Sequence, residues 1–507
     1  MSGSTQQQYP TRGKGKVALS LAPLLVLVLA AAFVFLYGLG ARPLEDWDEA
    51  IYAQVAKEIA RGGDWLTLHW EYQNWFEKPP LLMWTTAIFY RLFGVTEFWS
   101  RAASALSGIG TVALVYLLGK RLYKDERTGL IAGLILLTSY HFVSFSRFGT
   151  TDVMLTFFTY LAIYAFVRQR EGGHVWWYVV WSACALAVMS KGAGGWIAPA
   201  AIIISLAFEG RRSGALRTRH FWLALLLTVL IVAPWHALMY LRHGQTFLDE
   251  YVGYHVFARV RTPLEGHATN YFFYIGKIVD GFFPWCLLLP FAVVSSIREN
   301  IWGETRSRIL LLLVALVVIV YTLVQSKLVW YIVPAYPALA LLVAAFLRKI
   351  YLSAHNRRKL KFALTALGVL LVLAGGVYSF LLIRLTHRPE ESLAGIAALA
   401  ASRSANDREP LLLFSDTEAL TRPAALFYSD RPLRQVYLTN EPHSPRARRY
   451  ETVEKLESVV SSSSPARIVL RREDLEKLSA AYDVKVEAEA DPFIYALIKR
   501  RTVGRAQ

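Results

Sequence analysis

The chain has 507 residues, of which 55% are hydrophobic and only 18% are charged, whereas soluble domains carry about 25% charged residues. Its apolar residues fall in blocks of about 17 to 24, the length that crosses the hydrocarbon core of a membrane. These features exclude an ordinary soluble protein and predict a polytopic membrane protein. The net charge of +17 then indicates basic cytoplasmic loops rather than nucleic-acid binding, and no nucleic-acid partner is expected.

A basic tail, residues 1–16, precedes the first apolar block at 17–39. That block is too long for the apolar region of a cleaved signal peptide, and no small-residue cleavage site follows it, so a retained span is expected. The stretch 79–93 is about 14 residues long, which favours an interfacial or re-entrant segment over a span. The other predicted spans bring the total to about 11: 98–118, 129–145, 152–167, 175–190, 193–208, 221–240, 281–298, 308–325, 329–347 and 362–385.

This number of spans separates basic loops from acidic ones. With a cytoplasmic N-terminus, the inner connections carry most of the lysines and arginines of the short loops, as the positive-inside rule requires. The opposite connections hold most of the acids: Glu45, Asp46, Asp48, Glu49, Glu58, Asp64, Glu71 and Glu77. We therefore expect the N-terminus inside and the C-terminus outside.

The composition changes near residue 386, where strand-like runs begin to alternate with helical stretches. The runs are 410–414, 435–438, 467–470, 484–488 and 493–498, a pattern that predicts a small α/β domain. The expected organisation is a cytoplasmic tail at 1–16, a transmembrane domain at 17–385 with outer loops 41–97 and 241–280, and a soluble extracytoplasmic α/β domain at 386–507.

Ionisable residues cluster at the outer ends of the spans, where they are costly and hence functional candidates. They are Arg147, Asp152, Lys191 and Lys327. A single lysine there is equally well explained as an anchor whose amine reaches the membrane surface. A transporter would place such residues near the midplane. Clustering on the acidic face favours an interfacial active site.

The first outer loop contains a short helix pattern from Asp48 to Gly63. Ile51, Val55 and Ile59 fall on one face, which predicts an amphipathic helix lying on the membrane. The acids at its start have a simple alternative role as helix caps. Asp46-Trp47-Asp48 also matches a short metal-binding pattern of nucleotide-sugar transferases, but nucleotide sugars are not expected outside the cell, so we assign no metal there.

Several motifs together resemble a known family. They are Asp48-Glu49-Ala50 with Tyr52, Gly63-Asp64-Trp65, Phe76-Glu77-Lys78-Pro79-Pro80-Leu81, Thr151-Asp152, Ser190-Lys191-Gly192, His267 before the aromatic run 271–274, and Lys327-Leu328 with Tyr331 and Pro334. Over about residues 40–340 the chain resembles the bacterial aminoarabinose transferase and protein O-mannosyltransferase-like GT-C glycosyltransferases. Two features depart from the family: Ile51 stands where members commonly have Arg, and the aminoarabinose transferases carry more spans after the Lys-Leu hairpin. The sugar is therefore left unassigned.

The resemblance implies a multi-pass enzyme of the bacterial plasma (inner) membrane that uses a polyprenyl-phosphate sugar. The acceptor would be a lipid A-type glycolipid, a glycan or a protein, reached by inverting transfer. Asp48 matches the catalytic aspartate and would act as the base for an acceptor hydroxyl. Cations would stabilise the lipid phosphate as it leaves. The donor-site candidates are Tyr52, Glu77, Lys78, Arg147, Asp152, Lys191, Lys327 and Tyr331.

Other roles rest on fewer residues. Glu49, Arg259 and His267 are candidates for acceptor or loop contacts. Glu77 and His267 suggest a metal pair, but two ligands do not complete a zinc site, and the mechanism requires no metal. A lipid-linked-sugar flippase or transporter is the alternative function, although the spans 221–240, 308–325 and 362–385 are almost bare of charge. A non-catalytic sensor would leave Glu77-Lys78 and Asp152 unexplained.

Overall fold

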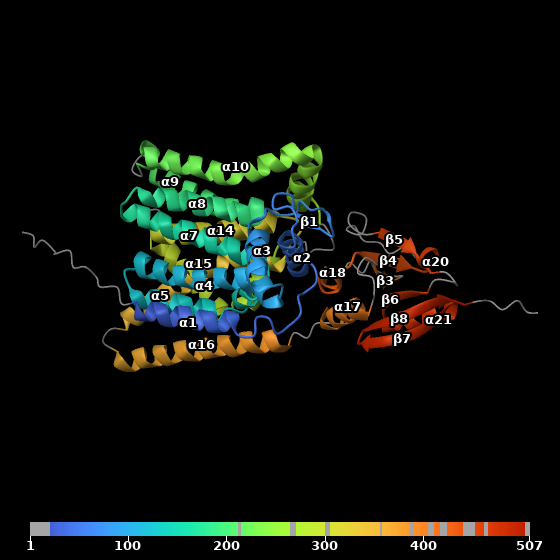
Figure 1. The fold of residues 1–507 in the computed structure, drawn as a ribbon. Coiled ribbons are helices and arrows are strands. Elements are labelled where there is room, and N and C mark those ends of the chain that lie inside the picture. The colour runs from blue at the N-terminus through green and yellow to red at the C-terminus, as the bar shows by residue number, and fades with distance from the viewer. Residues whose placement is uncertain are drawn as a thin grey trace, which may run out of the picture.

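The structure, a computed structural model, describes residues 21–210, 214–263, 270–299, 305–354, 357–385, 390–403, 410–415, 423–439, 452–460 and 465–501. It consists of a bundle of apolar helices with a sheet domain at one end (Figure 1). The bundle comprises α1 (Ala22–Leu36), α4 (Glu97–Leu122), α5 (Glu126–Leu137), α6 (Tyr140–Ser146), α7 (Thr151–Glu171), α8 (Val175–Lys191), η1 (Gly192–Trp196), α9 (Ile197–Glu209), η3 (Ala215–Arg217), α10 (Arg219–Phe247), the π-helix η4 (Leu248–Ala258), α11 (Arg259–Arg261), α12 (Phe273–Gly281), η5 (Trp285–Leu288), α13 (Leu289–Arg298), α14 (Thr305–Leu323), η6 (Val329–Ala335), α15 (Tyr336–Ser353) and α16 (Arg358–Leu385).

The apolar helices coincide with the predicted spans. By length and composition, six helical runs of the described chain could cross a membrane, or eight if each of two bent pairs is one span, and three apolar helices are shorter. One of the six runs, Val175–Glu209, contains two predicted spans. The chain folds back within it, since a Cβ on Gly195 would lie 2.4 Å from Val188 Cα. The predicted class of polytopic helical membrane protein is confirmed.

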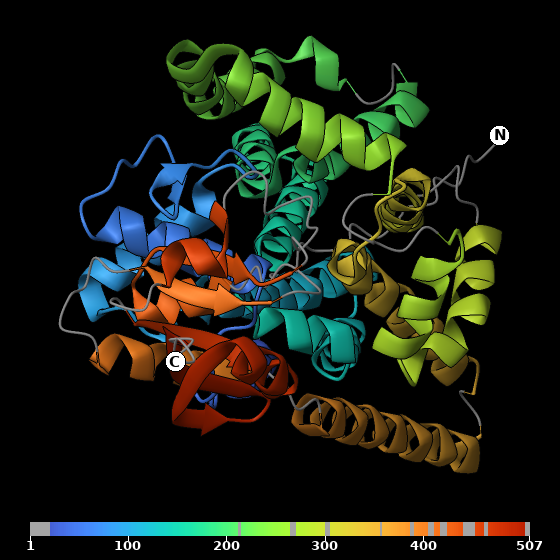
Figure 2. The same cartoon turned by 90° about the vertical axis from the view of Figure 1, so that its right-hand side faces the viewer.

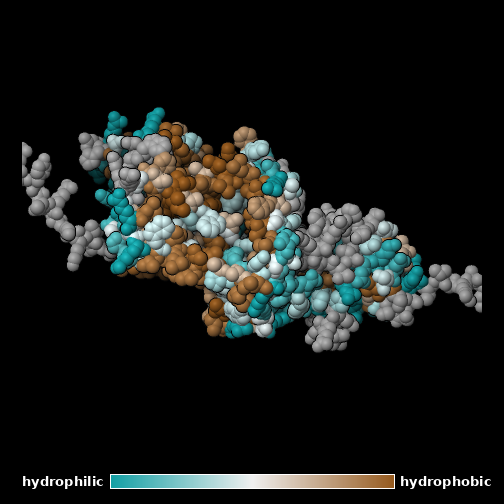
Figure 3. Space-filling view, turned by 90° about the horizontal axis from the view of Figure 1, so that it is seen from above, coloured by the Kyte–Doolittle hydropathy of each residue, from teal (hydrophilic) through white to brown (hydrophobic). Residues whose placement is uncertain are grey.

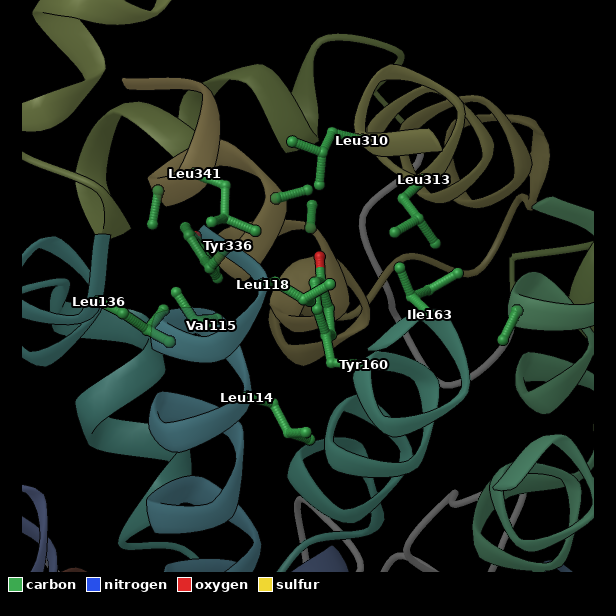
Figure 4. Close-up of a cluster of buried hydrophobic side chains, with 14 of the residues drawn as sticks. Leu114, Val115, Leu118, Leu136, Tyr160, Ile163, Leu310, Leu313, Tyr336 and Leu341 are labelled. Carbon is green, nitrogen blue, oxygen red and sulfur yellow. The ribbon is translucent and has the colours of Figure 1, made fainter. Parts of the chain in front are cut away.

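The most deeply buried helices form the centre of the bundle. In the apolar 18-residue stretch of α4, of α7 and of the run that ends in α15, 72% is buried inside the protein. The buried share is 22% for the run that contains α10 and 11% for α16. Figure 4 shows part of this core, where Leu118, Tyr160, Leu310 and Tyr336 converge from four helices. Helices α10 and α16 lie at opposite edges in Figure 1, and brown apolar residues cover much of the face of the bundle seen in Figure 3, as expected for a lipid-facing surface.

The first outer loop forms α2 (Asp48–Ala60), the short strands β1 (His69–Trp70) and β2 (Gln73–Asn74), and α3 (Leu81–Phe93). Helix α3 covers the stretch predicted to be interfacial and runs across the direction of the spans in Figure 1. The turns predicted to face the cytoplasm, after α4, α7 and α9, gather at the opposite end of the bundle (left in Figure 1).

Helix α2 is not the membrane-surface helix that the amphipathic pattern predicted. Its limits agree, but every residue from Glu49 to Ile59 is buried, including Gln54, Lys57 and Glu58. The C-terminal domain covers the polar face, and Ile51, Val55 and Ile59 share one apolar cluster with Leu393 and Leu426.

The C-terminal domain is the expected α/β unit. A six-stranded sheet has the order β5-β4-β3-β6-β8-β7, in which β5, β4, β3 and β6 are parallel and β8 and β7 are antiparallel. Strand β5 is the one that the sequence pattern did not predict. Figure 2 shows the sheet in front of the segments around α2 and α3. The elements are α17 (Glu390–Arg403), β3 (Leu411–Phe414), α18 (Pro423–Ser429), β4 (Leu433–Tyr437), β5 (Thr452–Lys455), α20 (Leu456–Val459), β6 (Ala466–Arg471), η7 (Arg472–Asp474), α21 (Leu475–Ala481), β7 (Tyr482–Ala490) and β8 (Phe493–Arg500).

Candidate active site

A cavity of about 170 Å³ lies where α8, α14 and the π-helix η4 meet the first outer loop. Three cations line it, Lys78, Lys191 and Arg259, and they come from three separate parts of the sequence. Its other lining includes Glu77, Tyr251, His255, Tyr321 and Tyr331. A cavity that carries three cations at the ends of apolar helices suits an anion that arrives from the membrane.

A tight turn after α8 positions Lys191 in this cavity. Gly192 has φ 59° and ψ −120°, a backbone conformation that is unfavourable for residues with a Cβ atom. A Cβ on Gly192 would also lie 2.7 Å from Tyr251 Oη, and one on Gly194 would lie 2.9 Å from Tyr321 Oη. The glycines therefore allow the chain to reverse beside two tyrosine hydroxyls.

Lys191 belongs to a buried network. Its ammonium pairs with the carboxylate of Asp152, which also accepts a hydrogen bond of 3.1 Å from Thr150 Oγ1. The ammonium lies 4.3 Å from the ring centroid of Tyr331, and the Tyr331 hydroxyl accepts a 3.3 Å hydrogen bond from Arg259. The sequence-predicted residues Asp152, Lys191, Arg259 and Tyr331 thus form one cluster.

Arg259 is held by the hairpin that follows α14. Ser326 N donates to Arg259 O at 3.1 Å, and Gln325 N donates to Val260 O at 3.3 Å. Two outer segments that are distant in sequence, the end of η4 and the loop before η6, therefore fix this guanidinium at the cavity wall.

Lys78 enters the cavity from the loop before α3. Burial lowers its pKa, and the positive charges of Arg259 and Lys191 lower it further, while Glu77 and Asp48 act in the opposite direction. Glu77 is itself buried, and its Oε1 lies 3.9 Å from His255 Nε2. Pro79 and Pro80 restrict the backbone immediately after Lys78.

Asp48, the first residue of α2, lies next to these cations. It interacts electrostatically with Lys78 and Lys191, and the Tyr52 hydroxyl donates a hydrogen bond to it. Burial raises the pKa of Tyr52, and the negative charges of Asp48 and Glu77 raise it further, so Tyr52 is a neutral donor. The preceding Trp47 has φ 70°, a strained value for a bulky residue, and such strain is concentrated at functional sites.

The neighbouring acids have structural partners. Glu49 forms a buried ion pair of 2.8 Å with Arg101 and accepts a hydrogen bond from Gly149 N. Asp46 accepts one of 2.9 Å from Ala424 N in the C-terminal domain. The N-cap residue of α2, Trp47, makes no side-chain capping hydrogen bond, while Asp48 and Glu49 lie in the first turn of the helix, where a negative charge favours the helix dipole. Glu49 and Asp46 thus have structural partners, and Asp48 lies beside the cations of the site.

Three predicted site residues lie elsewhere. Arg147 donates to the carbonyl oxygens of Val34, Phe35 and Tyr37 at the end of α1 and lines a different cavity. Lys327 donates to Val324 O at 2.7 Å, and its ammonium lies 5.6 Å from the ring centroid of Tyr271. His267 lies outside the described residues.

Sequence reasoning missed Tyr251, His255 and Tyr321 in the cavity lining. Tyr251 and His255 lie in the loop 241–280, which is rich in aromatics and histidines, and Tyr321 lies in α14, so only the tertiary contacts bring the three together. Among the described residues, no group of three or more His, Cys, Asp or Glu side chains could hold a metal ion.

Comparisons with known proteins agree with this architecture. Residues 77–237 match the family described as dolichyl-phosphate-mannose-protein mannosyltransferase. An undecaprenyl phosphate-alpha-4-amino-4-deoxy-L-arabinose arabinosyl transferase from Pectobacterium carotovorum is 29% identical over 346 residues, which is 66% of this chain and 60% of that protein. The chain thus spans about three fifths of the length of that relative.

A protein of Aquifex aeolicus that carries no functional name is 30% identical over 361 residues, covering 70% of this chain and 69% of that protein. The crystal structure of ArnT from Cupriavidus metallidurans bound to undecaprenyl phosphate has a TM-score of 0.75 and 21% identity, and covers 94% of this chain and 98% of that one. The chain belongs to the ArnT-like GT-C glycosyltransferases. The matched relatives of this family that bear functional names are transferases, so the transporter alternative gains no support.

Proposed function

We propose that this ArnT-like protein transfers a sugar from a polyprenyl-phosphate donor to an acceptor on the outer face of a bacterial plasma membrane. The observation that carries the proposal is the cavity in which Lys78, Lys191 and Arg259 converge at the outer ends of apolar helices, beside the carboxylate of Asp48. The named relatives use an undecaprenyl-phosphate donor, and the related ArnT structure holds undecaprenyl phosphate, which fits such a cavity.

The cations would act on the leaving group. Breaking the anomeric C–O bond leaves its electron pair on the lipid phosphate, and charge grows on the phosphate oxygens in the transition state. Lys191 and Arg259 are already held by side-chain contacts, and Lys78 is buried beside them, so the three cations would stabilise that charge with little reorganisation. Asp152 orients Lys191, and Tyr331 bridges Lys191 and Arg259.

Asp48 would act on the acceptor. A hydroxyl that attacks the anomeric carbon from the face opposite to the leaving phosphate must lose its proton, and Asp48 accepts it, with Tyr52 holding the carboxylate. Attack from that face inverts the anomeric configuration. Glycolipids, glycans and proteins all offer suitable hydroxyls, and a phosphate acceptor would need Asp48 for orientation alone.

Glu77 and His255 are placed for two positions of a divalent ion, with the other positions left to water or phosphate oxygens. Two protein ligands are fewer than a closed site requires, so the steps above use only the side chains of the chain.

The test is transfer from a radiolabelled polyprenyl-phosphate sugar by the purified protein. We expect Asp48→Asn to lower transfer to a hydroxyl acceptor by at least about a hundredfold while donor binding persists, because the amide cannot accept the proton. Asp249→Asn removes an exposed carboxylate of the other predicted outer loop, 241–280, and should leave the rate unchanged. Movement of intact donor across vesicles without sugar transfer would contradict the proposal.

A further inference from the structure

A second and larger cavity, of about 570 Å³, lies at the edge of the bundle between α1, α6 and α16. It shares no lining residue with the cavity described above. Most of its wall is apolar. Four arginines are grouped at its outer end, together with one carboxylate, that of Glu45; the arginines are Arg42, Arg101, Arg147 and Arg384.

The cavity opens sideways toward the hydrocarbon of a membrane. Phe33 and Tyr37 of α1 are each 67% exposed and Phe380 of α16 is 58% exposed, and all three line the cavity. Figure 1 shows α1 and α16 neighbouring each other along the same edge of the bundle. In a bilayer these side chains would meet lipid chains rather than water.

The floor of the cavity is a fixed feature of the fold. The span formed by α5 and α6 bends by 72° near Thr138, and Ser379 Oγ donates to Thr138 O at 3.1 Å. Helix α16 approaches closely there, since a Cβ on Gly375 would lie 3.1 Å from Thr138 O. From Gly376 to Arg384 the helix rises by about 12 Å, close to the hydrocarbon depth of about 15 Å in one leaflet.

Contacts of several kinds orient the arginines at the mouth. Arg101 pairs with Glu49 at 2.8 Å, and Arg42 donates to Ile383 O at 3.2 Å. Arg147 donates to carbonyls at the end of α1, and the Arg384 guanidinium lies 5.5 Å from the ring centroid of Phe380. A carbonyl oxygen or an aromatic ring orients a guanidinium without removing its positive charge.

The arginines also act on one another. Burial lowers the pKa of Arg147, and the charges of Arg101, Arg384 and Arg42 lower it further. An anion at the mouth would relieve this repulsion, and the membrane supplies phosphates at that depth.

We propose that this cavity binds one anionic phospholipid of the surrounding bilayer, with its phosphate among Arg42, Arg147 and Arg384 and an acyl chain between α1 and α16. The volume lies within the range of about 300–1,000 Å³ that is usual for ligand pockets. Lys78 and Asp48 serve the other cavity, which favours a bilayer lipid over the sugar donor as the occupant.

A lipid bound in this cavity would stabilise the segments that position the active site. It joins α16 to α1 and to the segment 42–45, which leads directly into α2. Arg101, which lines the cavity, holds Glu49, the residue beside Asp48. The inference itself does not depend on the proposed transfer reaction.

The test is native mass spectrometry of the purified full-length protein with phosphatidylglycerol or phosphatidylcholine of identical acyl chains. We expect phosphatidylglycerol to bind at least about tenfold more tightly, and Arg384→Gln and Arg42→Gln each to remove most of that preference. Gly376→Leu should weaken binding of both lipids by filling the groove, since a Cβ at that position has its nearest neighbour 4.0 Å away.

Arg358→Gln is the matched control, because it removes an exposed arginine from the opposite end of α16 and should change nothing. Thermal unfolding reports whether each variant folds. If Arg42→Gln does not fold, Arg384→Gln still tests the proposal, because Arg384 is exposed. Equal binding of the two lipids would overturn the proposal. The proposal would also be overturned if polyprenyl phosphate displaced the bound lipid, and if Lys78→Met weakened lipid binding while Arg384→Gln did not.

Discussion

Lys78 illustrates how the site keeps its cations poised. Burial lowers the pKa of its ammonium, and Arg259 and Lys191 lower it further, while Glu77 and Asp48 act in the opposite direction. A bound lipid phosphate would reverse that balance, since it supplies the missing negative charge. The cationic cluster is therefore more favourable with an anion present than without one, which is the property that a donor site needs.

This balance predicts an alkaline limit to activity. Because the pKa of Lys78 is lowered from 10.5, the free enzyme should lose this charge, and kcat/KM should fall, as the pH rises through a value below 10.5. Lys78→Arg should move the fall to higher pH, because arginine stays protonated. Lys78→Met should lower transfer at saturating donor by about ten- to a hundredfold, the value of one charge-assisted hydrogen bond.

The control for Lys78 is Lys349→Arg, an exposed lysine paired with Glu299, which should leave the pH profile unchanged. An alkaline limb that stays in place in Lys78→Arg, or full turnover by folded Lys78→Met, would remove Lys78 from the phosphate site.

At the scale of elements, the turn from α8 into η1 decides where Lys191 points. Gly192→Ala would place a Cβ in a backbone conformation that costs about 1–3 kcal/mol and would push it against Tyr251 Oη. We expect a lower unfolding temperature and weaker donor binding. Gly376→Ala, at a helical glycine with open space, should have neither effect. An unchanged donor affinity in Gly192→Ala would mean that the turn does not shape the cavity.

Helix α2 depends on the C-terminal domain for its position. Lys57 Nζ lies 2.8 Å from Asp430 Oδ1 and donates to Phe427 O at 2.6 Å, and Arg61 pairs with the other carboxylate oxygen of Asp430. A helix whose charged face is paired in this way is held in register rather than floating on the membrane. The residue that begins it, Asp48, is then fixed as well.

This contact predicts a dependence on acid. Partial burial opposes ionisation of Asp430, but Lys57 and Arg61 outweigh it and lower its pKa below 3.8. A depressed carboxylate pKa stabilises the docked state above pH 3.8, and the contribution is lost as the pH falls through the lowered value. Hydrogen exchange in α2 should therefore accelerate below about pH 4 in the wild type.

Asp430→Asn should exchange faster at neutral pH and show a smaller change on acidification. If α2 exchanges at the same rate in the wild type and in this variant at every pH, the ion pairs do not hold the helix.

At the scale of the whole molecule, both cavities open at the end of the bundle that carries α2 and the sheet domain. The donor cavity lies among α8, α14 and η4, and the arginine-rich cavity lies at the edge formed by α1 and α16. The two cavities share no lining residue, and the segment 42–45 leads from the arginine-rich cavity into α2.

Cysteine labelling tests this orientation. In a background with Cys184→Ala and Cys286→Ala, a membrane-impermeant thiol reagent applied outside should label Asp64→Cys and Gln245→Cys, and should not label Lys124→Cys or Arg217→Cys. The first two positions lie in the outer loops, and the last two lie in turns at the opposite end of the bundle. Labelling of Lys124→Cys in sealed cells would show that the orientation is the reverse of the predicted one.

The sequence by itself predicted the apolar spans, the limits of α2 and the α/β nature of the C-terminal domain, all of which the structure contains, and the sidedness of the loops, which stays a prediction. Each is set by local properties: the length of an apolar run, the placement of charges beside it, and the glycines that end a helix. The motif residues from Asp48 to Tyr331 were found in the same way, because their spacing along the chain identifies the family.

Only the tertiary structure decided which of these residues meet. Arg147 and Arg259 both stand at outer span ends, but packing brings Arg259 to Lys191 and directs Arg147 to the end of α1. The burial of α2 was likewise invisible, because Lys57 meets Phe427 across 370 positions of sequence. A pattern along the chain records which faces of an element are apolar. What covers a polar face, and which charges share one cavity, follows from long-range packing, which no local pattern encodes.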